Sequence, residues 1–301
     1  AWWDGTYKLD HADAMMSRWG SSEFSTDWGA RILSDRVSFY DPISYHQGSV
    51  WPLFTGWLSV AEYRAGHPLV GYAQLMHNVE LTWSQDLGDV TELLSGQFYQ
   101  VLGRSTAHQL WSSAMVISPV LRGMFGLAWD AATHTLTVTP HLPADWNAAK
   151  LRRVPLGSDH LDLTFTRHQG ELQVELSGDA AKTVHLTSSV PGASTKAGVL
   201  HIPLSPLEAS MKSELPEFGA ETRQMKVLDE QSLPHELKLT LAAQGSSQHT
   251  FLLRENDPNI KIHTGDAEIG HEQNNMSPVS VVFPAANGED GYVTKTVTFT
   301  W

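Results

Sequence analysis

Apolar residues recur at three- and four-residue spacing in four segments of the first 126 residues, which is the periodicity of one helix face. This spacing predicts helices over 10–20, 49–66, 67–83 and 105–126. Helix-starting and helix-stopping residues stand at the segment ends: Asp10, Ser49 and Ser105 as N-caps, Pro52 and Pro68 in first turns, Gly20 and Gly66 as stops. We therefore expect antiparallel helices joined by long loops.

The segment 105–126 carries the longest apolar stripe of the four. Its members are Leu110, Ala114, Ile117, Leu121 and Phe125. Pro119 lies within this segment and predicts a kink, because proline removes a backbone donor and crowds the preceding turn.

The periodicity changes from three or four to two at Thr133. Apolar and polar residues then alternate in segments separated by Gly, Pro and Asn clusters, which predicts strands over 134–140, 160–178, 182–190, 235–243, 249–255, 279–284 and 293–301. Composition changes in the same region, since ten of the eleven Trp residues precede residue 150. The expected organisation is a helical domain over 1–130, a linker over 131–150 and an antiparallel β-sandwich over 151–301.

Charge and cysteine content narrow the possible partners. The net charge of −13 is spread over both halves of the chain and disfavours binding to nucleic acid or to an anionic membrane surface. With no cysteine, the chain has no disulfide and no thiolate metal site, which fits a cytoplasmic or a periplasmic protein. His134 and His141 lie too far from each other and from carboxylates to suggest a metal site, so no metal and no cofactor is expected.

The strongest chemical signal is a group of carboxylates in a long, apolar loop after residue 83. Long loops inside compact domains are usually functional or disordered, and this one is too aromatic for disorder. Glu92 lies between Thr91 and Leu93, an environment in which a carboxylate can serve as a general acid or base. Asp86 and Asp89 are alternatives in the same loop. A solvated or helix-capping glutamate is the competing interpretation.

Four short motifs resemble those of bacterial glycogen-debranching, amylo-α-1,6-glucosidase-like enzymes, which are relatives of glucoamylases and trehalases. The motifs are FSTDWGARILS, YDPISYHQGSVWP, VTELLSG and STAHQLWSSA, in that order. The resemblance covers roughly residues 24–126. It implies the C-terminal part of an (α/α)6 toroid, with the active site where the inner helices begin.

The resemblance also implies roles for individual residues. Glu92 matches the general base, which activates water for an inverting attack on the anomeric carbon of an oligo- or polysaccharide. Substrate contacts are implied for Tyr45, His46, Gln47, Trp51, His108, Gln109 and Arg31. Trp51 could instead pack against neighbouring helices, His46 could bond the adjacent turn, and Arg31 could pair with Asp27 or Asp35.

The general acid of such enzymes lies upstream of the first motif, where only some two dozen residues are present. The opening AWWDGTYKLD, with two adjacent tryptophans, also suggests the middle of a larger protein. We therefore expect the acid in a missing N-terminal part of the same enzyme, either on the same polypeptide or as a second chain. The alternatives are a non-catalytic carbohydrate-binding or structural module and, third, a polysaccharide lyase with a Tyr or His base.

Overall fold

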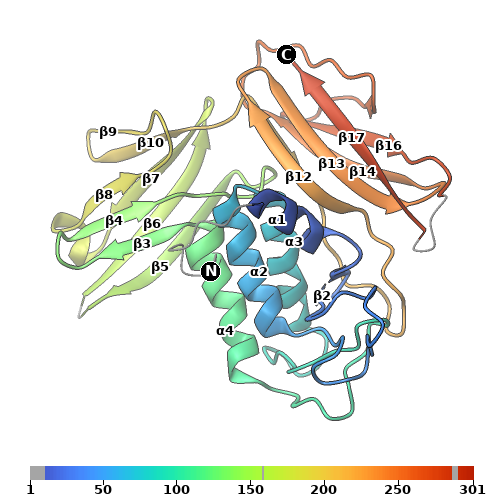
Figure 1. Cartoon of the computed structure of the whole chain (residues 1–301). Coiled ribbons are helices and arrows are strands. Elements are labelled where there is room, and N and C mark those ends of the chain that lie inside the picture. The colour runs from blue at the N-terminus through green and yellow to red at the C-terminus, as the bar shows by residue number, and fades with distance from the viewer. Residues whose placement is uncertain (1–10, 158, 287–290) are drawn as a thin grey trace.

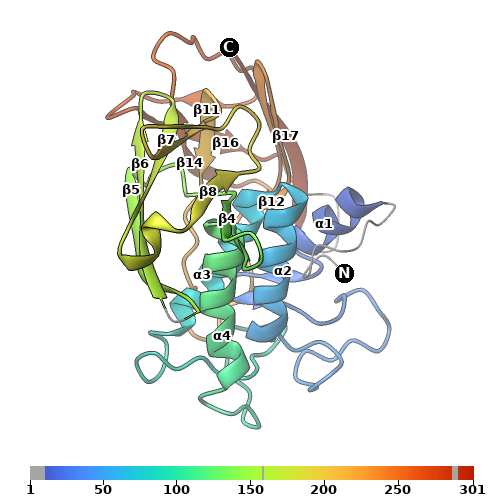
Figure 2. The ribbon, with the colours of Figure 1, turned by 90° about the vertical axis from the view of Figure 1, so that its left-hand side faces the viewer.

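The computed structural model describes residues 11–157, 159–286 and 291–301; the predicted cap Asp10 and the N-terminal AWWDGTYKLD lie outside this range. Strands hold 37% of the described residues and helices 20%. The described residues form four α-helices, namely α1 (Ala12–Gly20), α2 (Pro52–Ala65), α3 (Pro68–Leu81) and α4 (Leu110–Pro119). In Figures 1 and 2, α2, α3 and α4 pack side by side between two groups of strands.

Local signals place the helix ends correctly in several cases. Pro52 and Pro68 are the first residues of α2 and α3, and Gly66 ends α2 in the left-handed conformation at φ 89°. The residue at the N-cap of α2 is Trp51, so the prediction of Ser49 is wrong by two positions. The cap of α4 is Gln109, because the residues from Ser105 to His108 remain in the preceding loop. At Pro119, α4 passes into a π-helical turn, Val120–Met124.

The first group of strands follows α4 and forms two sheets. Its members are β3 (Leu127–Asp130), β4 (Thr135–Val138), β5 (Ala148–Leu156), β6 (Asp159–His168), β7 (Glu171–Ser177), β8 (His185–Ser188), β9 (Ser194–Lys196) and β10 (Val199–Pro203). One sheet has the order β5-β6-β7-β10-β9 and the other β3-β4-β8. We call this group the first lobe. Its core contains Phe165 and Leu136 together with Tyr63 of α2 and Leu75 of α3.

The second lobe contains the remaining strands. They are β11 (Leu207–Ser210), β12 (Lys226–Leu233), β13 (Glu236–Gln244), β14 (Gln248–Glu255), β15 (Glu268–Ile269), β16 (Met276–Val282) and β17 (Tyr292–Thr300). Their sheets have the orders β11-β14-β16-β15 and β12-β13-β17. Phe251 and Phe299 belong to a separate core that also includes Leu69 and Val70 of α3. Both lobes are thus attached to the helices.

The predicted fold class, a partial (α/α)6 toroid followed by one antiparallel sandwich, is wrong. Four helices cannot form a ring of helix pairs, and strands dominate the described chain in five sheets, the fifth being the short pair β1 (Ser25–Thr26) and β2 (Gly29–Ala30). The sheets divide between two hydrophobic cores instead of enclosing one. In addition, β4 and β8 pair in parallel. The domain boundaries at 130 and 150 stay a prediction.

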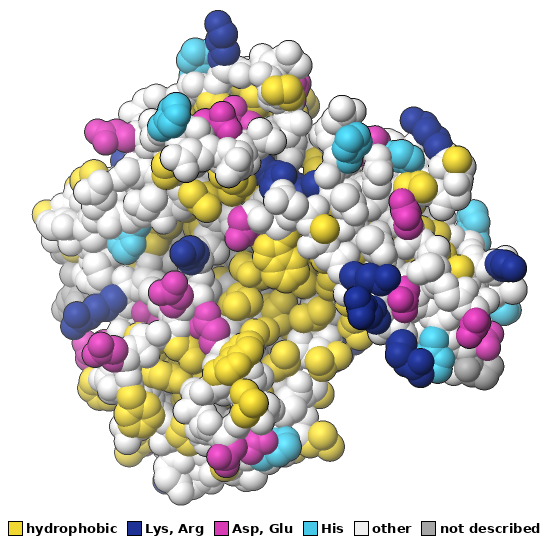
Figure 3. Space-filling model, turned by 180° about the vertical axis from the view of Figure 1, so that it is seen from behind, with side chains coloured by type: hydrophobic (Ala, Val, Ile, Leu, Met, Phe, Trp, Pro, Cys, Tyr) yellow, Lys and Arg dark blue, Asp and Glu magenta, His cyan; other side chains and the backbone are white. Residues whose placement is uncertain are grey.

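Within α4, the apolar stripe faces outward, whereas Phe125, which follows the helix, is buried in the core of the first lobe. Leu110 is 79% exposed and Ile117 58%, whereas Ser112 and Met115 are the buried residues of this helix together with Pro119. Met115 fits against Gly56 of α2, where an added Cβ would lie 2.4 Å from the methionine Cβ. Seen from behind, the molecule also has apolar side chains gathered in the hollow between its two lobes (Figure 3). Apolar periodicity therefore identified the stripe without indicating whether it is covered.

Candidate functional site

The side chains of Tyr45 and Glu92 meet where two loops come together. The Tyr45 hydroxyl donates a hydrogen bond of 2.5 Å to Glu92 Oε1. The backbone N–H and the hydroxyl of Thr106 both lie 3.3 Å from Glu92 Oε2 and donate to it. Glu92 is only 6% exposed, so these donors replace most of its solvent contacts. The loops that carry these residues gather at one end of the helices in Figure 1.

Backbone bonds fix the two loops against each other. Val50 and Leu94 exchange a pair of N–H to carbonyl bonds of 2.9 Å each, and the Glu92 N–H donates to the Thr106 carbonyl at 2.9 Å. Between the loops, the backbone is so close at Gly96 that an added Cβ would lie 2.0 Å from the Gly48 carbonyl oxygen. Only glycine permits this approach.

Residues of the first motif support the segment that follows Glu92. Trp28 is fully buried, and its indole N–H donates to the Ser95 carbonyl at 2.8 Å. Arg31 donates to the carbonyl of Gly96 at 2.6 Å and to that of Ser22 at 2.5 Å. The four motifs quoted from the sequence are therefore joined in space around Glu92.

The Arg31 side chain is buried and makes its contacts with other residues of the protein. It is 7% exposed, and its guanidinium also lies 3.5 Å from the Asp35 carboxylate. These contacts favour the ion-pair role with Asp35 over a contact with substrate. Asp27, the other proposed partner, binds Lys226 instead.

An aromatic group covers the start of α2 beside Glu92. The rings of Tyr45 and Trp51 meet edge to face with centroids 4.7 Å apart, and the His46 ring stacks on Trp51 at 5.8 Å and 10°. Trp51 is 4% exposed and donates its indole N–H to Ser49 Oγ and the Tyr45 carbonyl. The rings that solvent reaches are accordingly those of His46, which is exposed, and Tyr45, which is half-buried.

The other predicted site residues lie on the surrounding loops. His108 is exposed, and its Nδ1 lies 2.9 Å from Asp89 Oδ1. Gln109 caps α4 by accepting a bond from the Leu110 N–H, and its own N–H donates to the Val90 carbonyl at 3.0 Å. Gln47 is exposed, and its side-chain oxygen lies 3.3 Å from the Ser44 hydroxyl. The helix predicted over 105–126 would place His108 and Gln109 in its first turn. This is wrong, because α4 begins at Leu110 and both residues precede it.

Hydrogen bonding keeps the Tyr45 hydroxyl protonated. Donation to the Glu92 carboxylate raises the pKa of Tyr45 above its usual value of 10.0, so Tyr45 remains a donor. A carboxylate offers about four acceptor positions, and the three donors described above occupy three of them. The remaining position can hold a water molecule, which is what a general base requires.

Thr106 is a site residue that the sequence analysis missed. Its neighbours in the motif STAHQ were recognised, but Thr106 follows no periodic pattern and carries no charge. The only available signal was its position one residue after the expected cap, Ser105, in the loop that leads to α4.

The described residues contain no group of three or more His, Cys, Asp or Glu side chains that could hold a metal ion. His141 is half-buried, and desolvation lowers its pKa to about 4. Within the same part of the chain, no helix is both long and apolar enough to cross a membrane.

Comparison with known proteins adds no relative. No family model matches the chain, and no curated protein matches it either. The resemblance described above therefore depends on the four motifs alone.

Proposed function

We propose that this chain belongs to an inverting glycoside hydrolase that acts on α-glucosidic linkages of the glycogen or maltooligosaccharide kind, with Glu92 as the general base. The observation that supports this proposal is the convergence of the four motifs on one carboxylate. Glu92 is oriented by Tyr45 and Thr106, and it lies beside rings that suit the apolar face of a sugar.

In this proposal, Glu92 removes a proton from a water molecule that attacks the anomeric carbon from the side opposite the leaving oxygen. Tyr45 and Thr106 hold the carboxylate so that its free acceptor position faces that water. His46, Gln47, His108 and Gln109 provide donors and acceptors for sugar hydroxyls. A second carboxylic acid must protonate the leaving oxygen, and we assign it to another part of the same enzyme.

A substrate with a good leaving group tests Glu92 separately from that acid. Fluoride leaves without protonation, so hydrolysis of α-glucosyl fluoride requires the base but not the acid. We expect the chain to release β-glucose first, visible by NMR, because inversion changes the anomeric configuration. Glu92→Gln keeps the size of the side chain but removes the proton acceptor, and should slow this hydrolysis by roughly 10²–10⁴.

The matched control is Asp86→Asn, which makes the same chemical change at an exposed acid of the same loop and should leave the rate unchanged. Unchanged turnover in Glu92→Gln would remove Glu92 from the mechanism. Initial release of α-glucose would contradict inversion.

A non-catalytic carbohydrate-binding module is the second candidate. The observation in its favour is that three protein donors already bind Glu92, which suits a structural carboxylate as well as a base. Under this alternative the chain binds maltooligosaccharides but hydrolyses neither them nor the fluoride. Calorimetric titration with maltoheptaose beside the fluoride assay distinguishes the two candidates.

A further inference from the structure

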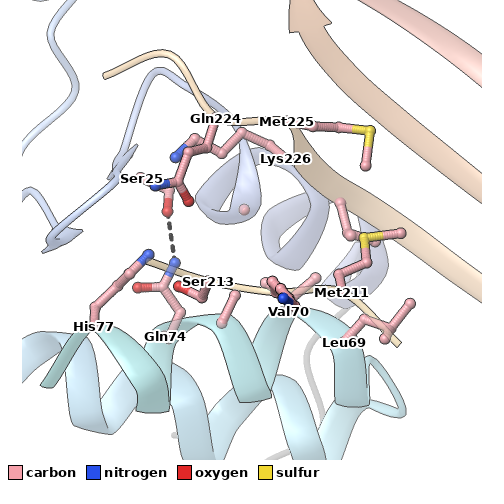
Figure 4. Close-up of a pocket in the computed structure, with 14 residues that line it drawn as sticks. Ser25, Leu69, Val70, Gln74, His77, Met211, Ser213, Gln224, Met225 and Lys226 are labelled. Atoms are coloured by element: carbon pink, nitrogen blue, oxygen red, sulfur yellow. Dashed lines mark hydrogen bonds between the residues drawn. The ribbon is translucent and has the colours of Figure 1, made fainter. Parts of the chain in front are cut away.

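A small cavity lies between α3 and the chain that leads into the second lobe. Its volume is about 40 Å³. Gln74 and His77 project into it from α3, opposite Ser25 and the segments around Ser213 and Lys226 (Figure 4). It is separate from the site around Glu92, since none of its lining residues belongs to that site.

Three polar atoms on the wall of this cavity have no hydrogen-bond partner among the residues that the structure describes. They are Gln74 Oε1, His77 Nδ1 and Ser213 Oγ. Gln74 is 1% exposed and His77 3%. The amide nitrogen of Gln74 donates to Ser25 Oγ at 2.6 Å, which fixes the amide so that its oxygen is the end left unpaired. Buried polar atoms are rarely left unpaired, because each costs its desolvation free energy.

The charges around the cavity favour a neutral occupant. Burial lowers the pKa of His77 to about 3, so the imidazole is neutral. Of the two lysines that line the cavity, Lys212 is exposed and the Lys226 ammonium is already paired with Asp27 Oδ1 at 2.5 Å. A cation would be repelled by Lys226, and an anion would face the Gln74 carbonyl oxygen and the Asp27 carboxylate. An apolar guest would leave the three atoms unpaired.

We propose that this cavity binds ordered water that bridges Gln74 Oε1, His77 Nδ1 and Ser213 Oγ. Water both donates and accepts, so one molecule can serve the amide oxygen, the ring nitrogen and the hydroxyl. A buried water needs about 10–15 Å³ and two to four polar partners, so the cavity holds between one and about three molecules. The water joins α3 to the segment before β12 and thereby completes the contact between the helices and the second lobe.

A high-resolution crystal structure of the whole chain tests this proposal directly. We expect an isolated density peak within hydrogen-bond distance of both Gln74 Oε1 and His77 Nδ1. In solution, the same water should give cross-relaxation between the water resonance and the Gln74 side-chain amide protons. An empty cavity, or density for a larger organic molecule, would overturn the proposal.

A cavity-filling variant provides the control. Ala73 lines the cavity, and Ala73→Leu retains helix propensity while occupying the space. We expect this variant to remain folded and to lose the water cross-relaxation. Ala114→Leu makes the same change at an exposed position of α4 and should retain the water cross-relaxation. Cross-relaxation of equal strength in Ala73→Leu would show that the signal comes from elsewhere and would contradict the assignment.

Discussion

Lys226 Nζ lies 2.5 Å from Asp27 Oδ1, and this buried ion pair joins residues 199 positions apart in the sequence. Asp27 also accepts bonds from the Thr222 hydroxyl and from the backbone N–H groups of Arg223 and Gln224. Burial by itself would raise the pKa of Asp27, but the Lys226 charge and these hydrogen bonds lower it to about 2. The pair therefore connects the loop before β2 with β12 of the second lobe.

Removing one partner of this pair should be costly. Lys226→Met leaves the Asp27 carboxylate buried without its counter-ion, and we expect the free energy of unfolding to fall by about 3–5 kcal/mol. The double variant Asp27→Asn/Lys226→Met contains no buried charge and retains an acceptor for the backbone donors, so it should lose less than Lys226→Met alone. Urea unfolding measures both. Equal losses in the single and double variants would show that the ion pair is not the cause.

The Tyr45 hydroxyl should contribute to stability through its bond to Glu92. Tyr45→Phe removes a donor to a carboxylate, and we expect a loss of about 1.5–3 kcal/mol in the free energy of unfolding. Tyr63→Phe is the matched control, because the Tyr63 hydroxyl is buried and has no hydrogen-bond partner in the described part of the chain. That variant should be neutral or stabilising. If the two variants behave alike in denaturant titrations, the Tyr45–Glu92 bond does not form in solution.

Local features of this fold could be predicted from sequence because their causes are local. The alternation in 160–178 predicts strand structure, and the structure forms β6 and β7 there, paired antiparallel. The left-handed φ of Gly66 and the positions of Pro52 and Pro68 likewise depend on the residue itself.

The arrangement of these elements could not be predicted in the same way. The parallel pairing of β4 with β8 joins Thr135 to His185, and no periodicity indicates which strands become neighbours. The same limit applies to the two cores, because Leu136 and Leu237 have equivalent alternating surroundings but pack in different lobes. The toroid was inferred from motifs that lie mostly in loops, and such motifs describe a site more closely than they describe a fold.

At the candidate site, residues from different motifs lie together although they are distant in sequence. Tyr45 and Glu92 are 47 positions apart and in hydrogen-bond contact. The burial of Trp51 and the contacts of Arg31 depend on the packing of several loops, which no single motif contains. Asp27 and Lys226 were missed as a pair for the same reason.

The two faces of α4 should respond differently to truncation. Met115 is 7% exposed and packs against Gly56, so Met115→Ala should lower the free energy of unfolding by about 2–5 kcal/mol. Ile117 is 58% exposed, and Ile117→Ala should change the free energy of unfolding by no more than about 0.5 kcal/mol. Thermal and urea unfolding of both variants provide the comparison. A large loss in Ile117→Ala would show that something covers this face in solution.

Stability should fall as pH rises through neutrality, because a buried carboxyl on α2 holds its proton. The Glu62 side chain is fully buried, and burial raises its pKa from 4.5 to about 7, although its bond of 3.0 Å to His67 opposes this shift. Above pH 4.5 the folded state therefore binds more protons at Glu62 than the unfolded state does. The resulting stabilisation is complete below about pH 4.5 and is lost as the pH rises through about 7.

His67 acts in the same direction, since its bond to Glu62 raises its pKa above 6.5. We expect the free energy of unfolding to fall by up to about 1.4 kcal/mol per pH unit and per proton between pH 5 and 8, as measured by urea titration across that range. Glu62→Gln cannot titrate and should reduce this slope, whereas Asp86→Asn, at an exposed loop position, should leave it as in the parent chain. If the stability of Glu62→Gln depends on pH as that of the parent chain does, the proton is held by another group. Burial also raises the pKa of Glu230 to about 7, so Glu230 is the next residue to replace.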